Sequence, residues 1–576
     1  MKRIVSLALA LLLLTCGGCF AEESTPVFYC RRYPVLCADV NNTLGSDWQL
    51  FFTDEADDMP WLDLEELGDM VTALENDVYG KPGFLLTYDQ EGDIFTLQRE
   101  NGSFMMVDYS TNTISFDNYN AFVQQPDTNS LLDLLYASGF NEAGEAELFQ
   151  QDIWASYDRT GDLMILDLSE YGIPMATENG RAYIPLQTAN DFVIAPLTSR
   201  SLLFNGNQVF FARADDMYNS DTEEFTPLSE LYYAAKPTAL SQPFADFCKN
   251  ELTMMLDHLY GLKQKHNIVS FDRMFWQIGF DEPLSSTAAA DIDNALRLFI
   301  NYYLDDLHSV YSLPSWMAGT DVELSGGYGP SHRLYDRQEE EYKAIRRSII
   351  GDVPGYQEVG NTAYITFDGF HSIYTAASYY NAASEGKRLD DTIGLIIYAN
   401  QQISREDSPI ENVVIDLSAN SGGDADAALF VISWIMGQAE VSVEDSATGA
   451  QSTLVYRADV NLDREFDARD TLAGKHVYCL TSPVSFSCGN LVPAVCKASQ
   501  TVTLIGRTSG GGSCLVQNMS TATGAMFTIS GTKRLSFRKN GSLYDIDEGI
   551  EPDVYINHPE TLYDRNKLTD LINQLP

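Results

Sequence analysis

The segment VSFSCGN, residues 484–490, holds two serines separated by one residue. A serine hydroxyl becomes a nucleophile when a base takes its proton, and the reaction also needs amides that stabilise an oxyanion. We expect an apolar strand before this segment and a helix after it, so the helix N-terminus and its positive dipole end would lie near Ser487. The match to the G-x-S-x-G nucleophile turn is weak, because Ser485 replaces the first glycine. We predict Ser487 as the nucleophile and Ser485 as the second choice.

A base for such a serine is usually histidine, whose pKa is best matched to proton transfer near neutral pH. The chain has seven histidines. His308 lies in LDDLHS at the end of a helical region, and His371 lies in DGFHSIY. The weaker candidates are His258, His266, His332, His476 and His558.

The elements that must position these residues form an alternating pattern from about Gly360 onward. Apolar strands alternate with helices, and the strands end in polar or glycine-rich loops, which indicates a layered α/β domain whose site lies at the carboxyl ends of its strands. The expected strands lie within 361–370, 411–423, 475–482 and 500–512. The expected helices lie within 372–386, 392–404, 424–437 and 488–499.

The earlier part of the chain has a different character. Residues 23–242 contain short runs with turn signals at Asn101-Gly102 and Asn205-Gly206, which predict hairpins in an α+β or mainly β accessory region of one or two modules. Residues 243–352 show apolar spacing of three and four, which predicts a helical region that ends near Gly351. We therefore expect a multidomain α+β protein with an α/β core at 353–576.

Five elements in order resemble the tail-specific or C-terminal processing serine peptidases. These are LDDLHS, VVIDLSANSGG, VYCLTSPVSFSCGN, VTLIGRTSGGG and DEGIEPDV, and together they cover roughly residues 245–560. The resemblance implies a ClpP/crotonase-like core and a reaction on peptide bonds without a cofactor. It also favours Ser487 as the nucleophile. In the family the nucleophile stands three residues before a position that is usually Glu, and Asn490 occupies that position here.

The resemblance also bears on the base. One branch keeps a lysine in the Gly-rich loop, but this chain has glycines at 510–512. The tricorn-core-like branch uses Ser, His and Glu, which carried over here implies that His308 takes the proton of Ser487 and that Glu548 helps to orient His308. Leu307 replaces the serine that precedes the histidine in that branch, and His371 stays the rival base.

Glycine-rich segments supply the remaining predicted parts. The amide of Cys488 and an amide of Gly422 or Gly423 would form the oxyanion hole, because glycine lets the backbone approach a carbonyl closely. Thr508, Gly510 and Gly511 belong to the G-x-x-T-x-G loop, which the resemblance places beside the substrate.

Charge excludes some partners. The net charge of −46 repels phosphate backbones and anionic lipid headgroups, so we expect no nucleic-acid binding. Apart from the signal region there is no CxxC pair and no Cys/His cluster with zinc spacing, so we expect no metal site.

The first 19 residues are typical of a lipoprotein signal peptide. Two positively charged residues and a short apolar run precede TCGGCF. The apolar run is too short to span a bilayer comfortably. We predict lipidation at Cys19, with Cys16 as the alternative, and a mature body outside the cytoplasm whose only membrane contact is this lipid; plain secretion is the other possibility. Export permits disulfides, and Cys30 and Cys37 are close enough in sequence to close a small loop.

The sequence therefore predicts an exported, lipid-anchored serine endopeptidase. The alternatives are an inactive homologue that binds or scaffolds envelope proteins, and an esterase-type acyl hydrolase on the same residues.

Overall fold

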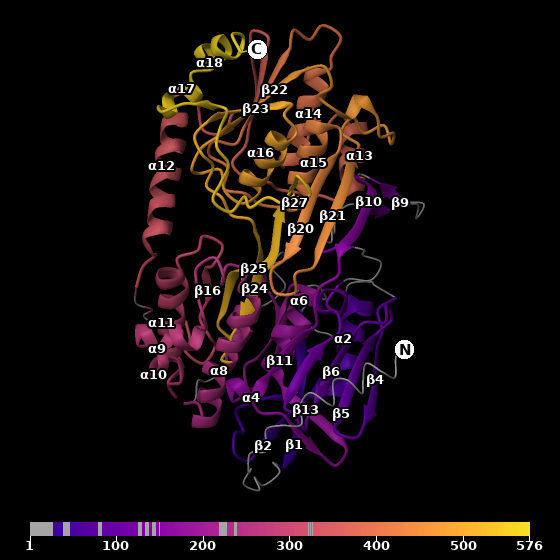
Figure 1. Ribbon diagram of the computed structural model, residues 1–576, viewed down its shortest axis with the longest axis vertical. Coiled ribbons are helices and arrows are strands. Elements are labelled where there is room, and N and C mark those ends of the chain that lie inside the picture. The colour runs from indigo at the N-terminus through magenta and orange to yellow at the C-terminus, as the bar shows by residue number, and fades with distance from the viewer. Residues whose placement is uncertain are drawn as a thin grey trace.

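The computed structural model describes residues 27–37, 47–78, 83–124, 130–132, 138–140, 146–148, 150–217, 227–235, 239–320, 322, 324 and 326–575. The N-terminal half lies at one end of the long axis and the C-terminal core at the other (Figure 1). Helix α12 (Pro330–Ile350) runs along one side between them. Cys16 and Cys19 lie outside the described residues.

The core sheet has the strand order β17-β18-β19-β22-β23-β28. Strands β18 through β28 pair in parallel, and β17 is antiparallel at the edge. Because the strands are parallel, the loops after β19, β22 and β23 meet at one edge of the sheet. The bounds are β17 (Gly355–Val359), β18 (Thr362–Thr366), β19 (Asn412–Asp416), β22 (His476–Thr481), β23 (Val502–Gly506) and β28 (Val554–Tyr555).

Helices cover both faces of this sheet. The buried side chains of α13–α16 pack in one cluster with β18, β19 and β22, and those of α12, α17 and α18 pack against the other face. The predicted alternation of strands and helices is confirmed. The helix bounds are α13 (Ala376–Ser384), α14 (Thr392–Ile403), α15 (Ala425–Met436), α16 (Cys488–Ala498), α17 (Pro559–Tyr563) and α18 (Arg565–Ile572).

The N-terminal half contains a mixed sheet of order β12-β13-β3-β2-β1-β15-β14 and an antiparallel meander of order β11-β7-β6-β5-β4. The predicted hairpin turns at 101–102 and 205–206 join β5 to β6 and β14 to β15. The bounds of the mixed sheet are β1 (Phe28–Cys37), β2 (Asp47–Thr53), β3 (Trp61–Asp63), β12 (Ala176–Glu178), β13 (Arg181–Pro185), β14 (Ser201–Phe204) and β15 (Val209–Ala212). Those of the meander are β4 (Leu86–Glu91), β5 (Ile94–Arg99), β6 (Phe104–Asp108), β7 (Thr113–Phe116) and β11 (Met164–Asp167).

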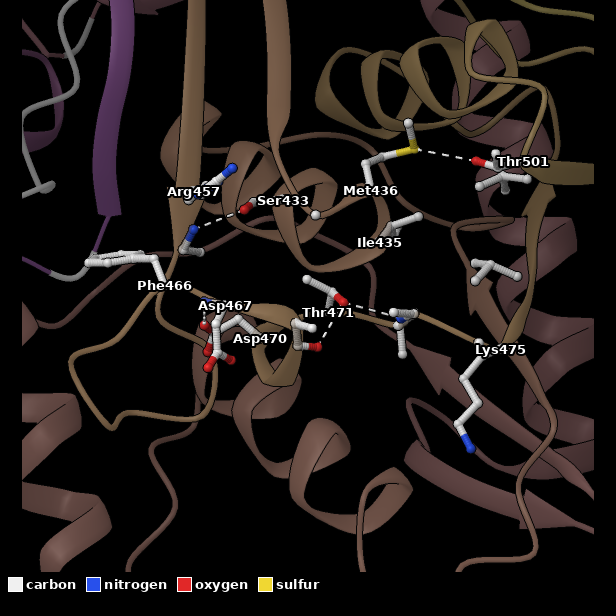
Figure 2. A pocket seen from close by; sticks show the side chains of 18 residues that line it. Ser433, Ile435, Met436, Arg457, Phe466, Asp467, Asp470, Thr471, Lys475 and Thr501 are labelled. Carbon is white, nitrogen blue, oxygen red and sulfur yellow. Dashed lines mark hydrogen bonds between the residues drawn. The ribbon is translucent and has the colours of Figure 1, made fainter.

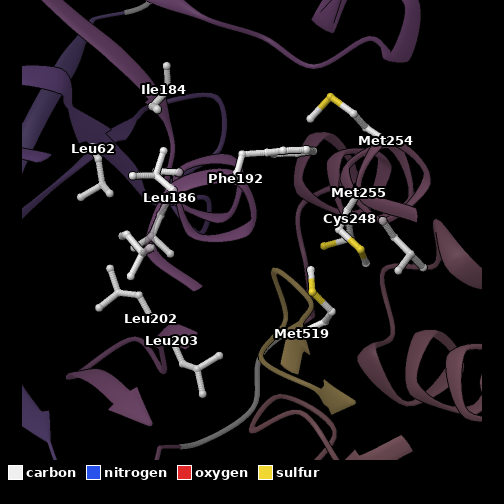
Figure 3. Packing of buried hydrophobic residues seen from close by; sticks show 14 of the residues in the cluster. Leu62, Ile184, Leu186, Phe192, Leu202, Leu203, Cys248, Met254, Met255 and Met519 are labelled. Atoms are coloured by element: carbon white, nitrogen blue, oxygen red, sulfur yellow. The ribbon is translucent and has the colours of Figure 1, made fainter. Parts of the chain in front are cut away.

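A connecting sheet of order β10-β21-β20-β25-β16 interlocks the two halves. Strand β10 comes from the N-terminal half, and β24 pairs with β25 and carries Met519 into the N-terminal core beside Cys248 and Met255 (Figure 3). The two halves are therefore joined by shared secondary structure and not only by a linker. The bounds are β10 (Gln150–Arg159), β16 (Tyr311–Leu313), β20 (Ala439–Asp445), β21 (Gln451–Ala458), β24 (Cys514–Ser520) and β25 (Met526–Ser536).

The helical region precedes α12 and packs on the same N-terminal core. Its last turn, Phe299–Leu304, is π-helical and ends at Asp305, whose φ is +49°. This sharp end turns the chain toward β16 and places His308 between the helix and the strand. The bounds are α8 (Gln242–Leu259), α9 (Phe271–Ile278), α10 (Asp281–Leu284) and α11 (Ala289–Leu298).

One cysteine prediction is wrong. Cys30 and Cys37 lie in the same extended strand, β1. Seven residues of strand span roughly 23 Å, whereas a disulfide needs Cα atoms within about 7 Å. Within the described ranges, no helix combines the length and apolarity needed to cross a bilayer.

Candidate active site

Ser487 lies at the sharp turn between β22 and α16, directly before the first residue of the helix. Its backbone has φ +55° and ψ −122°, a sparsely populated positive-φ conformation that costs a non-glycine residue about 1–3 kcal/mol. Its N–H donates to the Gly511 carbonyl at 2.8 Å. The turn presents a half-buried serine hydroxyl at a helix N-terminus, as a strained nucleophile turn does.

Ser485 has a different environment. Its Oγ donates to the Leu417 carbonyl at 2.7 Å and accepts from the Ser482 N–H at 2.9 Å. The side chain is fully buried. These contacts tie the turn to the loop after β19 and leave the hydroxyl no free access to a substrate.

The loop after β19 touches the side chain of Ser487. A Cβ on Gly422 would lie 2.6 Å from the Ser487 Cβ and 3.1 Å from its Oγ. The Gly422 N–H donates to Asn420 Oδ1 at 2.9 Å. By contrast, the amides of Gly423 and Cys488 donate no hydrogen bond to the residues that the structure describes. Of the predicted oxyanion donors, these two are available.

The Gly-rich loop after β23 packs against the same turn. Gly511 forms an isolated bridge with Phe486, and the Gly510 N–H donates to the Ser485 carbonyl at 2.8 Å. A Cβ on Gly510 would lie 2.4 Å from the Pro483 carbonyl oxygen, so this contact needs glycine. Thr508 lies half-buried at the start of the loop.

His308 lies against the nucleophile turn and is 7% exposed. Its N–H donates to Asp306 Oδ1 at 3.2 Å, and its carbonyl accepts from Thr528 Oγ1 at 2.8 Å, so β25 holds the segment in place. The imidazole packs on the Phe486 ring, with ring centroids 4.6 Å apart. Its buried Nε2 has no partner among the described residues, so no hydrogen bond joins His308 to Ser487.

Burial lowers the pKa of His308 below its usual value, while the negative charges of Asp306 and Asp547 oppose that shift. The imidazole is therefore neutral at neutral pH, which is the form that accepts a proton. Position and protonation state suit a base, although the ring must turn from Phe486 to reach the serine hydroxyl.

Two other histidines lie near this edge of the sheet. The residue before His371, Phe370, bridges to Gly423, but the imidazole of His371 is exposed and lies against Gly369. The Nδ1 atom of His332 lies 3.0 Å from Asp305 Oδ1. Asp305 also accepts the first N–H groups of α12, so the His332 pair belongs to the start of that helix.

Glu548 forms no hydrogen bond or ion pair with His308 among the described residues. Its side chain is 83% exposed, and its carboxylate pairs with Lys265 at 2.9 Å. The neighbouring Asp547 is the less exposed carboxylate at this position, with 10% of its side chain exposed. Sequence reasoning missed Asp547 because the motif spacing pointed to the adjacent residue.

Phe486 and Tyr335 were also missed. The Tyr335 hydroxyl donates to the Val484 carbonyl at 3.1 Å, and its ring lies 5.8 Å from that of Phe486. The sequence did contain a signal for Phe486, since it is an apolar residue between the two serines and its side chain must point away from them. Nothing in the helical pattern of 330–350 marks Tyr335 as a contact of the turn.

A cavity of about 550 Å³ lies elsewhere, at the amino ends of β22 and β23. Figure 2 shows Met436, Phe466, Thr471 and Lys475 around it. It contains none of the predicted site residues and lies at the opposite sheet edge from Ser487. Across the described chain, no group of three or more His, Cys, Asp or Glu side chains is arranged to hold a metal ion.

Residues 361–556 match the family model described as peptidase family S41. The matched range includes Gly422, Ser487 and Glu548 and begins after His308. No curated protein matches the sequence.

Several solved structures are similar to parts of this chain. The photosystem II D1 C-terminal processing protease is 18% identical, with 37% of this chain and 47% of that protein covered and a TM-score of 0.26, so the match spans about half of its length. A lipoprotein from Streptococcus agalactiae is 16% identical, with 59% and 98% covered and a TM-score of 0.32. Mature CPAF, solved with lactacystin, is 12% identical, with 58% and 96% covered and a TM-score of 0.36.

Proposed function

We propose that the protein is a serine peptidase whose nucleophile is Ser487, because residues 361–556 match the family model of peptidase family S41. The observation that carries this proposal is the strained turn of Ser487 at the N-terminus of α16. Strained backbone of this kind clusters at functional sites.

In the proposed reaction, Ser487 Oγ attacks the carbonyl carbon of a peptide bond while His308 takes the hydroxyl proton. The oxyanion accepts hydrogen bonds from the Cys488 and Gly423 amides, which have no other acceptor among the described residues. His308 then gives its proton to the leaving amine, and an acyl-enzyme remains on Ser487. Water, deprotonated by His308, releases the acyl group.

The chemistry requires a rearrangement, because His308 rests on Phe486 in the structure. Turning the imidazole about its side-chain bonds breaks no hydrogen bond of the ring, since the buried Nε2 has no partner among the described residues. We propose that substrate binding favours the turned state. Glu548, the third group carried over from the family resemblance, is too exposed to orient His308 directly.

Cleavage of a fluorescent denatured protein tests the proposal. Wild type and Ser485→Thr are expected to cleave it, and Ser487→Ala to lose activity by at least 1,000-fold while retaining its circular dichroism spectrum. Equal activity of Ser487→Ala and wild type would remove Ser487 from the mechanism. A comparison of peptide with p-nitrophenyl ester substrates separates a peptidase from an esterase.

His308 and Ser487 share no hydrogen bond in the described structure. This observation also favours a second candidate function, that of an inactive homologue that binds envelope proteins. Wild type with no cleavage of protein, peptide or ester, together with retained binding of denatured protein, would support that role.

We further propose that the mature protein is exported and anchored by a lipid on Cys19. The support is the sequence of the first 19 residues alone. Metabolic labelling with an alkyne fatty acid should mark wild type and Cys16→Ala but not Cys19→Ala. Labelling that is lost in Cys16→Ala and kept in Cys19→Ala would assign the lipid to Cys16. An unlabelled wild type would indicate plain secretion.

A further inference from the structure

A second cavity, which we call the junction cavity, lies where the two halves of the protein meet. Its volume is about 170 Å³. Its walls come from α3 (Tyr119–Phe122) and α6 (Ala195–Thr198) of the N-terminal half and from β20, β24 and β25 of the connecting sheet. At ~30 Å³ per water molecule, the junction cavity has room for a polar molecule of on the order of six non-hydrogen atoms.

Two neighbouring side chains in the wall of the junction cavity each have a buried polar atom without a partner among the described residues. These atoms are the Tyr119 hydroxyl and Asn120 Oδ1, and the two residues are 4% and 2% exposed. The other end of the Asn120 amide donates to Thr448 Oγ1 at 2.7 Å, which fixes the side chain. Burial raises the pKa of Tyr119, and the negative charge of Asp445 adds to the rise, so the hydroxyl keeps its proton and can donate.

These two atoms indicate a polar occupant. Buried polar atoms without a partner are destabilising and rare in folded proteins. Among the described side chains that line the larger cavity at the amino ends of β22 and β23, none has such an atom. The occupant of the junction cavity must offer a donor to Asn120 Oδ1 and an acceptor to the Tyr119 hydroxyl.

Side chains of both charges line the junction cavity near these atoms. Asp445, at the end of β20, is 1% exposed and accepts from Thr532 Oγ1 at 3.1 Å. Lys533 lies opposite Asp445 in the register of β20 and β25 and also lines the cavity. A carboxylate and an ammonium group in one wall are complementary to a ligand that carries both charges itself.

We propose that the junction cavity binds a small zwitterion, an α-amino acid with a short side chain such as alanine. The ligand ammonium donates to Asn120 Oδ1 on the side of Asp445, and the ligand carboxylate accepts from the Tyr119 hydroxyl on the side of Lys533. Both buried atoms thereby gain the partners that the protein does not supply, and no covalent step is involved.

The junction cavity shares a strand with the candidate active site. Gly531, Thr532 and Lys533 of β25 line the cavity, and the Thr528 hydroxyl of the same strand donates to the His308 carbonyl at 2.8 Å. An amino acid is also an end product of peptide hydrolysis. A regulatory effect of the ligand would rest on the proposed function, whereas its binding does not.

Calorimetric titration of the full-length protein with L-alanine tests the binding. We expect one site per chain with a Kd of about 1 mM or tighter, and binding at least about tenfold weaker in Tyr119→Phe, which loses only the unpartnered hydroxyl. Tyr88→Phe, a change on β4 outside the cavity, is the control and should bind as wild type does. Propionate and ethylamine, each with one of the two charges, should bind at least about tenfold more weakly than alanine.

A second variant blocks the cavity from an exposed position, so it does not depend on the folding of Tyr119→Phe. Val516 lines the cavity and is 50% exposed, whereas Val353 is 49% exposed and lies outside it. Val516→Phe should abolish alanine binding, and Val353→Phe should leave it unchanged.

Three results would overturn the proposal. Wild type without measurable alanine binding would show that the cavity holds water only. Equal affinity for alanine, propionate and ethylamine would exclude recognition of a zwitterion, and full binding by both Tyr119→Phe and Val516→Phe would place the ligand elsewhere. Alanine binding by a protein that lacks peptidase activity would refute the proposed function alone, and peptidase activity without alanine binding would refute this inference alone.

Discussion

Glu251 is a buried carboxyl group at the joint between the two halves of the protein. It lies on α8, is 1% exposed, and accepts a hydrogen bond from Thr188 Oγ1 at 2.7 Å, while its other oxygen has no partner among the described residues. The buried carboxyl of Asp191 lies beside it and binds Gln187, whose amide also reaches Ser520 of β24. Burial raises the pKa of Glu251 to about 8, and the Thr188 hydroxyl offsets part of that rise.

The sign of the pH dependence follows from that pKa. The folded state keeps Glu251 protonated up to about pH 8, whereas the unfolded chain releases the proton near its ordinary pKa of 4.5. Stability therefore falls as the pH rises from about 5 to 8. At ~1.4 kcal/mol per pH unit, ionising Glu251 in the fold costs on the order of 5 kcal/mol, an upper value because Asp191 shares the charge.

Glu251→Gln removes this ionisation with almost no change of shape. Urea unfolding at pH 5.5, 6.5 and 7.5 should show that the free energy of unfolding falls less steeply with pH in the variant than in wild type, by ~1 kcal/mol per pH unit. Glu170→Gln, an exposed change on α4 (Leu168–Tyr171), is the control and should follow wild type. Parallel curves for Glu251→Gln and wild type would show that Glu251 is not held protonated in the fold.

Three further predictions concern the site. Gly422→Ala should abolish cleavage and lower the free energy of unfolding by ~2–4 kcal/mol, because the φ of Gly422 is +106° and the new Cβ meets Ser487. The control Gly360→Ala is also at positive φ but in open space, so it should lower the free energy of unfolding by only ~1 kcal/mol. Similar effects of the two variants on activity would contradict the contact between Gly422 and Ser487. Asp305→Asn should lower the free energy of thermal unfolding by ~1–2 kcal/mol, because the Asp305 carboxylate accepts the first N–H groups of α12. The control Asp336→Asn, on the exposed face of α12, should leave that free energy almost unchanged. Equal losses in the two variants would argue against a capping role of Asp305. The acid limb of kcat/KM should lie below pH 6.5, because burial lowers the pKa of His308, and a limb above that value would exclude it as the base.

The core could be predicted from the sequence because its signals are local. The apolar run around Val413 and the glycines at 422 and 423 mark a buried parallel strand and the loop that follows it, and the structure has β19 there. Likewise, α16 begins at Cys488 as the strand-to-helix pattern indicated. In such elements, local pattern and tertiary environment agree.

The features that could not be predicted depend on long-range packing. Strand β10 pairs with β21 in the connecting sheet, and β24 carries Cys514 and Met519 into the N-terminal core, so each lies beside residues that are far from it in sequence. Whether Asp547 or Glu548 points inward depends on Lys265 and Ser513, which are distant in sequence from one another. Cys30 and Cys37 looked suitable for a loop, but their residues form one extended strand.

Covalent labelling shows whether Ser487 is an activated nucleophile. The full-length protein is treated with a fluorophosphonate, digested, and the modified residue is identified by mass spectrometry, because this reagent phosphonylates only an activated serine. We expect a single adduct on Ser487, absent in Ser487→Ala and strongly reduced in His308→Gln. An adduct on Ser485, or equal labelling of His308→Gln and wild type, would contradict it.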